Sequence, residues 1–154
     1  MGGSTGSLGP QPEPTVFTDL DSVKVGAAIC YESIFGEWIA GYVKKGAQAL
    51  FIITNDGWWG DTPGYRQHLQ YGRLRAIETR RSIARSANTG TSCFVNQRGD
   101  ILQPTPWWEA SVIKQTINLN DKITFYTRFG DYISKVAILL SFVLIGMFIF
   151  VRKK

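Results

Sequence analysis

The sequence predicts an α/β fold followed by one C-terminal transmembrane helix, and three features of its 154 residues carry this prediction. Residues 23–29 and 50–54 are short apolar runs of the kind that form strands. The segment between them has apolar residues at helical spacing, so the three segments make up a βαβ unit. Residues 133–151 are almost entirely apolar, which is long enough for a helix to cross a bilayer.

The first half of the chain can be divided at its Gly and Pro residues. The N-terminus is rich in Gly, Ser and Pro, so we expect residues 1–22 to form a loop or linker. Apolar residues recur at three- and four-residue spacing over residues 34–45, which predicts a helix that ends at Gly46. Residues 50–54 are continuously apolar, which is typical of a strand buried on both faces of a parallel sheet.

The second half continues with one helix and several short strands. An apolar stripe that includes Leu69 and Ala76 predicts a helix over residues 64–81. A hairpin turn is expected at residues 97–100, where Gly99 and Asp100 supply turn chemistry. The predicted strands of this half are residues 84–89, 91–96, 101–102 and, last, 111–119.

The end of the chain predicts how it lies in a membrane. Cationic residues after a spanning segment favour the cytoplasmic side, and here they are Arg152, Lys153 and Lys154. We therefore expect a spanning helix over residues 132–151 with the C-terminus cytoplasmic and the domain on the opposite face; in a bacterial cell these are the inner membrane and the periplasm. A buried core helix is the alternative, which apolarity on all sides disfavours. The N-terminus lacks the apolar core of a signal peptide, so either this helix alone directs the chain or a preceding part is missing.

Composition argues against several classes of function. The net charge of +5 is too small for a nucleic-acid footprint, so no nucleic-acid partner is expected. One histidine and no close Cys/His pair cannot form a typical zinc site, and no metal or other cofactor is expected. The two cysteines, Cys30 and Cys93, are too few for a disulfide framework. Both lie in apolar runs, where a lone cysteine most often packs as a small hydrophobic residue.

Cys30 is nevertheless the strongest candidate for a chemical role. It ends the apolar run 23–29 and is followed at once by a helical pattern, and sharp turns of this kind expose nucleophiles in α/β enzymes. Glu32 lies two residues beyond the thiol, and the polar segment 55–60 follows the next predicted strand. Because the carboxyl ends of parallel strands meet at one edge, we expect both segments to face one site.

Five segments together resemble the C-terminal half of the carbon–nitrogen hydrolase (nitrilase) family. They are residues 28–32, 54–60, 67–68, 73–78 and 85–90, and the closing helix makes the chain similar to the apolipoprotein N-acyltransferase branch. The resemblance implies that residues 23–130 form part of a nitrilase-like α/β/β/α sandwich. It also implies a Glu–Lys–Cys catalytic triad with Cys30 as the nucleophile, and Tyr31 and Glu32 as residues that support the pocket.

The resemblance further implies a two-step acyl transfer at a membrane. Cys30 would take an acyl chain from a phospholipid as a thioester and pass it to the N-terminal amine of a diacylglyceryl-cysteine apolipoprotein. Five residues are candidates for substrate binding: Asn55, Asp56, Trp58, Trp59 and His68. From the residues alone, the polar loop could be only a turn with interfacial tryptophans, and a single histidine is more often structural.

The chain departs from the family pattern upstream of Cys30. The family's triad glutamate and lysine precede the cysteine, whereas only 29 residues precede Cys30, and neither Glu13 nor Lys24 matches a family motif. We therefore expect a C-terminal fragment of the enzyme that is inactive on its own. Two alternatives remain open. One is a membrane-anchored amidase or nitrilase in which water resolves the thioester; the other is a non-catalytic membrane-tethered module in which Cys30 only packs.

Overall fold

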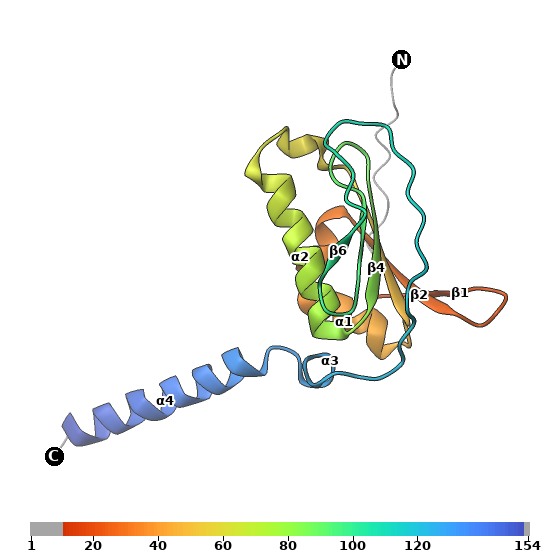
Figure 1. Ribbon diagram of the computed structural model, residues 1–154. Helices are drawn as coiled ribbons and strands as arrows, with labels where there is room; N and C mark the ends of the chain where they lie inside the picture. Colours follow the sequence, from red (N-terminus) through yellow and green to blue (C-terminus); the bar gives the residue numbers. More distant parts are fainter. Residues whose placement is uncertain (1–10, 153–154) are drawn as a thin grey trace.

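The computed structural model describes residues 11–152 and confirms an α/β domain followed by an apolar C-terminal helix (Figure 1). Two of its elements, η1 and η2, are short 3-10 helices. In chain order the elements are β1 (Val16–Thr18), β2 (Lys24–Ile29), η1 (Cys30–Ile34), α1 (Gly36–Lys44), β3 (Ala49–Thr54), η2 (Asp56–Trp59), α2 (Pro63–Thr79), β4 (Ser82–Ala87), β5 (Cys93–Val95), β6 (Ile101–Leu102), α3 (Phe125–Phe129) and α4 (Tyr132–Arg152).

The strands form one sheet in the order β1-β2-β3-β4-β5-β6. The central strands β2, β3 and β4 are parallel, and the outer strands pair antiparallel with their neighbours. The register places Ile29 opposite Ile53 and Thr54 opposite Ala87, so the parallel strands end at nearly the same level. The loops that follow these strands, beginning with Cys30, therefore meet at one edge of the sheet.

Helices α1 and α2 lie on one side of the sheet and form the apolar core with it (Figure 1). α2 begins where the Thr62 hydroxyl accepts the N–H of Gly64, with Pro63 in the first turn, and it ends at Arg80 in a left-handed conformation. Residues of both helices and of the strands fill the core: Ala28, Ile39, Tyr42, Val43, Leu50, Ile52, Leu69, Ala76, Ile83 and Val95. The two helices expected from apolar spacing are thus confirmed, with slightly shorter bounds.

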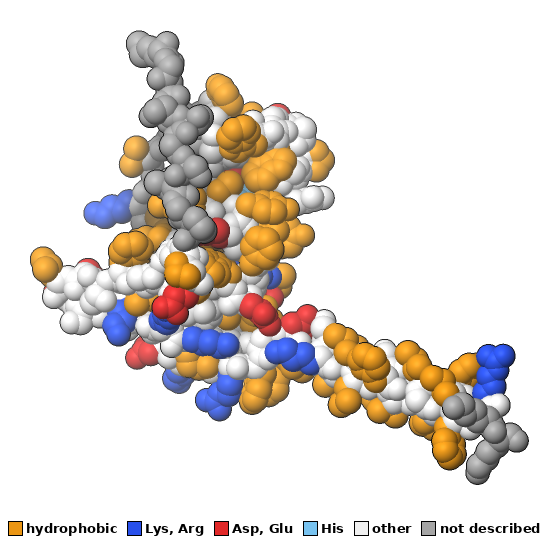
Figure 2. Space-filling model, turned by 180° about the vertical axis from the view of Figure 1, so that it is seen from behind, with side chains coloured by type: hydrophobic (Ala, Val, Ile, Leu, Met, Phe, Trp, Pro, Cys, Tyr) orange, Lys and Arg blue, Asp and Glu red, His pale blue; other side chains and the backbone are white. Residues whose placement is uncertain are grey.

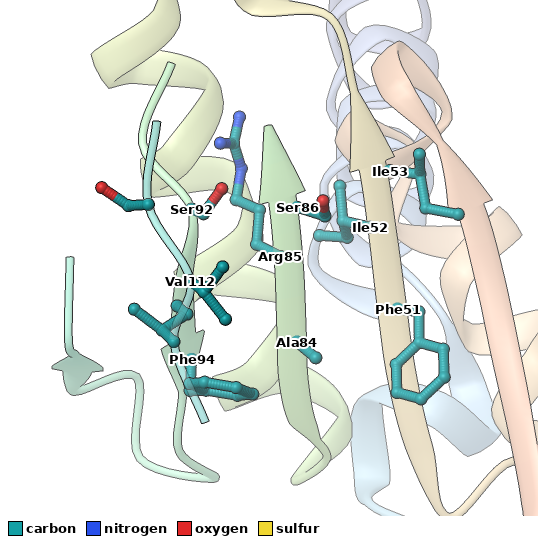
Figure 3. Close-up of a pocket in the computed structure, with 11 residues that line it drawn as sticks. Phe51, Ile52, Ile53, Ala84, Arg85, Ser86, Ser92, Phe94 and Val112 are labelled. Carbon is teal, nitrogen blue, oxygen red and sulfur yellow. The ribbon is translucent and has the colours of Figure 1, made fainter. Parts of the chain in front are cut away.

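The opposite face of the sheet is apolar and largely uncovered by the described chain. Ile53 is 52% exposed and Phe51 is 38% exposed, although both belong to the central strand β3. Figure 3 shows Phe51, Ala84 and Phe94 along this face, and a groove of about 410 Å³ lies between the strands and residues 111–113. One sheet with helices on a single face corresponds to one α/β half of the expected α/β/β/α sandwich.

Helix α4 extends away from the domain (Figure 1). It has 21 residues, and an 18-residue stretch within it has a mean hydropathy of 2.4 and no residue buried against the rest of the described chain. Among the described residues, no part of the chain covers α4 as the alternative of a buried core helix would require. α4 is long and apolar enough to cross a membrane.

Two sequence predictions differ from the structure. Residues 111–119 alternate like a strand but form none, because their backbone pairs with no strand of the described sheet. The end of this segment is held instead by contacts such as the Ser82 hydroxyl, which donates to the carbonyl of Asn118 at 2.8 Å. Part of the expected linker, residues 16–18, forms β1 by pairing with the free edge of β2. Residues 1–10 of that linker lie outside the described chain.

Candidate active site

Cys30 lies at the turn where β2 ends and η1 begins, as the sequence pattern predicts. Its backbone is left-handed, with φ of 51°, a conformation that residues with a Cβ adopt rarely and that concentrates at functional turns. The thiol is free and half-buried. A strand-to-helix turn of this shape lifts a side chain out of the sheet, which is the geometry expected of a nucleophile.

Three side chains hold the backbone of this turn. Glu32 Oε2 accepts the N–H of Ile29 at 2.7 Å. Ser33 Oγ donates to the carbonyl oxygen of Cys30 at 2.8 Å, and His68 Nε2 lies 3.1 Å from the same oxygen. His68 Nε2 also lies 2.8 Å from Ser33 Oγ, so the tautomer of the ring decides which of these two neighbours it bonds. Both Glu32 and His68 therefore act on the backbone around the thiol.

A buried polar cluster, formed by Asp56, His68 and Arg85, lies beside this turn. The Asp56 carboxylate is 0% exposed, and its two oxygens accept hydrogen bonds from Arg85 Nη2 at 3.0 and 2.9 Å. His68 Nδ1 lies 3.3 Å from Asp56 Oδ1, and the Thr54 hydroxyl lies 3.0 Å from the same oxygen. Asp56 and His68 are both buried, and His68 contacts the turn from within; their expected role in substrate binding stays a prediction.

The partners of Asp56 keep its carboxyl group ionised. Burial alone raises the pKa of a carboxyl group, but here the hydrogen bond with His68 and the charge of Arg85 outweigh it. Together with the hydrogen bonds from Arg85 and Thr54, they hold the pKa of Asp56 below its ordinary value. The cluster is thus built around a buried ion pair, which is stable only while both partners are present.

Asn55, also expected to bind substrate, serves the loop that contains it. Its Oδ1 accepts the N–H of Gly57 at 3.1 Å and the side-chain amide of Asn88 at 3.3 Å. The first bond caps η2, and the second ties the loop after β3 to the loop after β4. Both loops belong to the edge of the sheet that carries Cys30.

Aromatic side chains form a wall next to the thiol turn. The Trp59 ring lies 5.2 Å from the His68 ring and 6.3 Å from the Tyr31 ring, between centroids. Tyr31 and Trp58 are exposed, Trp58 to 81%. Apolar side chains gather on the face seen in Figure 2, on the side from which α4 extends. Tyr31 and Trp58 thus present apolar surface to solvent near the turn of Cys30.

The sulfur of Cys30 has one hydrogen-bond partner among residues 11–152, the Thr54 hydroxyl at 3.2 Å. A cysteine nucleophile needs a base that removes its proton, and a threonine hydroxyl is not such a base. His68 and Glu32 contact backbone atoms of the turn and not the sulfur. Within the same residues, no group of three or more His, Cys, Asp or Glu side chains could hold a metal ion.

Cys93 differs from Cys30 in its burial and in its place in the sheet. It is the first residue of β5 and is fully buried. Burial raises the pKa of its thiol to about 11, an effect that the charge of Arg85 only partly offsets. Cys93 is therefore a core residue, as expected from its position inside a strand.

Sequence reasoning missed three residues of this site: Ser33, Thr54 and Arg85. Arg85 carried a signal, since a charged residue in the middle of a buried strand needs a partner. Thr54 and Ser33 carried none, because each is a small polar residue next to a turn. Their partners depend on how the strands are aligned in register.

Comparison with known families agrees with this geometry. The family model described as carbon-nitrogen hydrolase matches residues 4–125, which include the sheet, α1, α2 and Cys30. The match also includes most of the segment expected to be a linker, in which the structure places β1.

Similar curated proteins carry the name apolipoprotein N-acyltransferase. The protein from Chlorobaculum tepidum is 43% identical over 130 residues, which cover 83% of this chain and 24% of the relative. The protein from Haemophilus ducreyi is 35% identical over 147 residues, which cover 95% of this chain and 28% of the relative. The chain thus spans about a quarter of the length of these relatives.

Solved structures show the same fold at low sequence identity. Nit3 of Saccharomyces cerevisiae, a member of the nitrilase superfamily, matches with a TM-score of 0.55 and 22% identity, over 67% of this chain and 40% of Nit3. A mutant amidase from Nesterenkonia sp. AN1, in which acrylamide has added to the active-site cysteine, matches with a TM-score of 0.52 and 20% identity. That match covers 66% of this chain and 41% of the amidase.

Proposed function

Because the chain belongs to the carbon–nitrogen hydrolase family, we propose that it supplies the cysteine-bearing part of an apolipoprotein N-acyltransferase. The observation that carries the proposal is the position of Cys30, a free, half-buried thiol on a left-handed turn at the carboxyl edge of the parallel strands. The name of the relatives supplies the class of reaction, an acyl transfer.

The proposed reaction has two acyl-transfer steps at Cys30. In the first, the thiolate attacks the ester carbonyl carbon of a phospholipid, the bond to the glycerol oxygen breaks, and the lysophospholipid leaves with a proton. In the second, the N-terminal amine of an apolipoprotein attacks the thioester, the carbon–sulfur bond breaks, and an amide forms. The amine loses a proton, and Cys30 is restored. The thioester divides one difficult step into two easier ones.

Both steps require groups that take up and return protons at the Cys30 sulfur. Among residues 11–152, the sulfur contacts only the Thr54 hydroxyl, which cannot do this. We expect a glutamate base and a lysine, as the family resemblance implies, from the part of the relatives that this chain does not span. General-base assistance is worth about 10²–10⁴-fold in rate. The 154 residues alone are therefore expected to transfer no acyl chain at a useful rate.

The membrane enters the proposal through α4 and the exposed aromatics. α4 would anchor the domain in the bilayer that contains the phospholipid donor, and the basic residues that end the chain would lie in the cytoplasm. The domain would then face the periplasm of a bacterial cell. Tyr31, Trp58 and Trp59 would offer an apolar wall to the acyl chain.

The experiment uses a chimera in which this chain replaces the matched region of the Chlorobaculum tepidum relative. Membranes that contain the chimera receive a phospholipid with a labelled acyl chain and a diacylglyceryl-cysteine peptide. The proposal predicts labelled amide with the parent chimera and with C93A, and none with C30A. Labelled free fatty acid without amide would indicate a hydrolase, and equal amide formation by C30A would exclude Cys30 as the nucleophile.

A further inference from the structure

The hydroxyl of Thr54 lies between the Cys30 sulfur and the buried polar cluster. Its oxygen is 3.2 Å from Cys30 Sγ and 3.0 Å from Asp56 Oδ1. Thr54 ends β3 and is 6% exposed, and the backbone N–H of Asn88 donates to its carbonyl oxygen at 2.9 Å. The backbone that carries this hydroxyl is therefore fixed by the sheet, while the hydroxyl proton can rotate.

A hydroxyl carries one proton, and that proton can form a short, nearly linear hydrogen bond with only one of two acceptors at a time. Asp56 does not depend on it, because Arg85 Nη2 donates to both carboxylate oxygens and His68 lies at hydrogen-bond distance. Cys30 Sγ, in contrast, has no other hydrogen-bond donor within residues 11–152. The Asp56 carboxylate therefore keeps other hydrogen-bond donors when the Thr54 proton turns away, whereas the Cys30 sulfur keeps none among these residues.

We propose that Thr54 is a positioning residue that directs its hydroxyl proton to Asp56 while Cys30 is a thiol and to the sulfur when Cys30 becomes a thiolate. In the thiol state, the Cys30 S–H can donate to the Thr54 oxygen. In the thiolate state, the sulfur becomes a charged acceptor, and charged acceptors form the stronger hydrogen bonds. The Asp56–Arg85 pair remains intact in both states, so the turn need not move.

This inference rests on the proposed role of Cys30 as nucleophile, but its test requires no acyl transfer. The full chain in detergent is treated with iodoacetamide at neutral pH, and alkylation of the peptide that contains Cys30 is followed by mass spectrometry. T54V keeps the shape of the side chain and removes the hydroxyl. We expect alkylation to slow by about three- to tenfold. Loss of one hydrogen bond to the charged sulfur lowers the fraction of thiolate, and the higher intrinsic nucleophilicity of the remaining thiolate offsets part of this loss.

Two further variants separate this role from a structural one. T54S restores the hydroxyl and should bring the rate back to within about twofold of the parent. T89V is the matched control, because the Thr89 hydroxyl lies near the same loops and has no hydrogen-bond partner within the described residues. Its alkylation rate should equal that of the parent. Should T54V fail to fold, as judged by circular dichroism, T54A replaces it in the same comparison with T54S.

An unchanged rate in T54V, or a T54S rate as slow as that of T54V, would overturn the inference. The outcome is independent of the chimera experiment. Slower alkylation of T54V together with a chimera that makes no amide would retain the role of Thr54 at the thiol and reject the proposed acyl transfer.

Discussion

Replacing Asp56 with Asn removes one partner of the buried ion pair at the centre of the site. The Asp56 and Arg85 side chains are 0% and 1% exposed, and Arg85 Nη2 lies 2.9 Å from Asp56 Oδ2. Asn keeps the shape but leaves the guanidinium buried without its counter-charge, a change that costs about 3–5 kcal/mol in comparable pairs. Domains of this size lose roughly 4 °C in Tm per kcal/mol, so we expect Tm to fall by about 12–20 °C.

The assay is thermal unfolding of the full chain in detergent, followed by circular dichroism. D61N is the matched control, because Asp61 forms an exposed pair with Arg66 at 3.5 Å and should leave Tm unchanged. The double variant D56L/R85M removes both charges and should be more stable than D56N, since an unpaired buried charge costs more than an apolar pair. A D56N protein with the Tm of the parent would refute the view that this ion pair stabilises the turn of Cys30.

The structure makes four further predictions. Because the folded-state pKa of Asp56 lies below its unfolded value, its contribution to stability is present above about pH 4 and is lost as pH falls through the folded-state pKa; the Tm difference between the parent and D56N should therefore be full at neutral pH and shrink as the pH falls below about 4. Iodoacetamide at pH 8 should modify Cys30 and leave Cys93 unmodified, because the Cys93 thiol is buried with a pKa of about 11, and peptide mass spectra would reveal the contrary. The open sheet face should make the isolated chain aggregate, so light scattering should fall in the double variant F51Q/I53Q but not in L74Q, which alters an exposed residue of α2. An impermeant thiol reagent added outside the cell should label W58C in a C30A background, and labelling only after lysis would contradict a periplasmic domain.

Local pattern was enough to predict the elements and the position of Cys30. The apolar run before Cys30 and the helical spacing after it are properties of adjacent residues, so β2, α1 and the turn between them follow from the sequence. The meeting of the loops after β2 and β3 followed from the rule that parallel strands end at a common edge. These are the parts that need no knowledge of register.

The interior of the site could not be predicted in the same way. The sequence predicted that the segment with Asp56 reaches the edge of the sheet, but not that the aligned ends of β3 and β4 bring Arg85 over Asp56 and bury both charges. Thr54 contacts Cys30 although the two residues are 24 positions apart in the sequence, and no local pattern predicts such a contact. The strand predicted over residues 111–119 is wrong for a related reason. An alternating pattern forms a strand only where another strand offers a free edge to pair with.

The central claim is that Cys30 carries the acyl chain, and one mass measurement tests it directly. The chimera is incubated with a phospholipid of known acyl composition in the absence of acceptor peptide, digested at mildly acidic pH and analysed before and after treatment with hydroxylamine. The account predicts that the peptide containing Cys30 gains the mass of one acyl chain and loses it with hydroxylamine, while the peptide containing Cys93 keeps its mass. An acyl chain found on another residue, or a Cys30 peptide that stays unmodified while the chimera still forms amide once acceptor is added, would contradict the account.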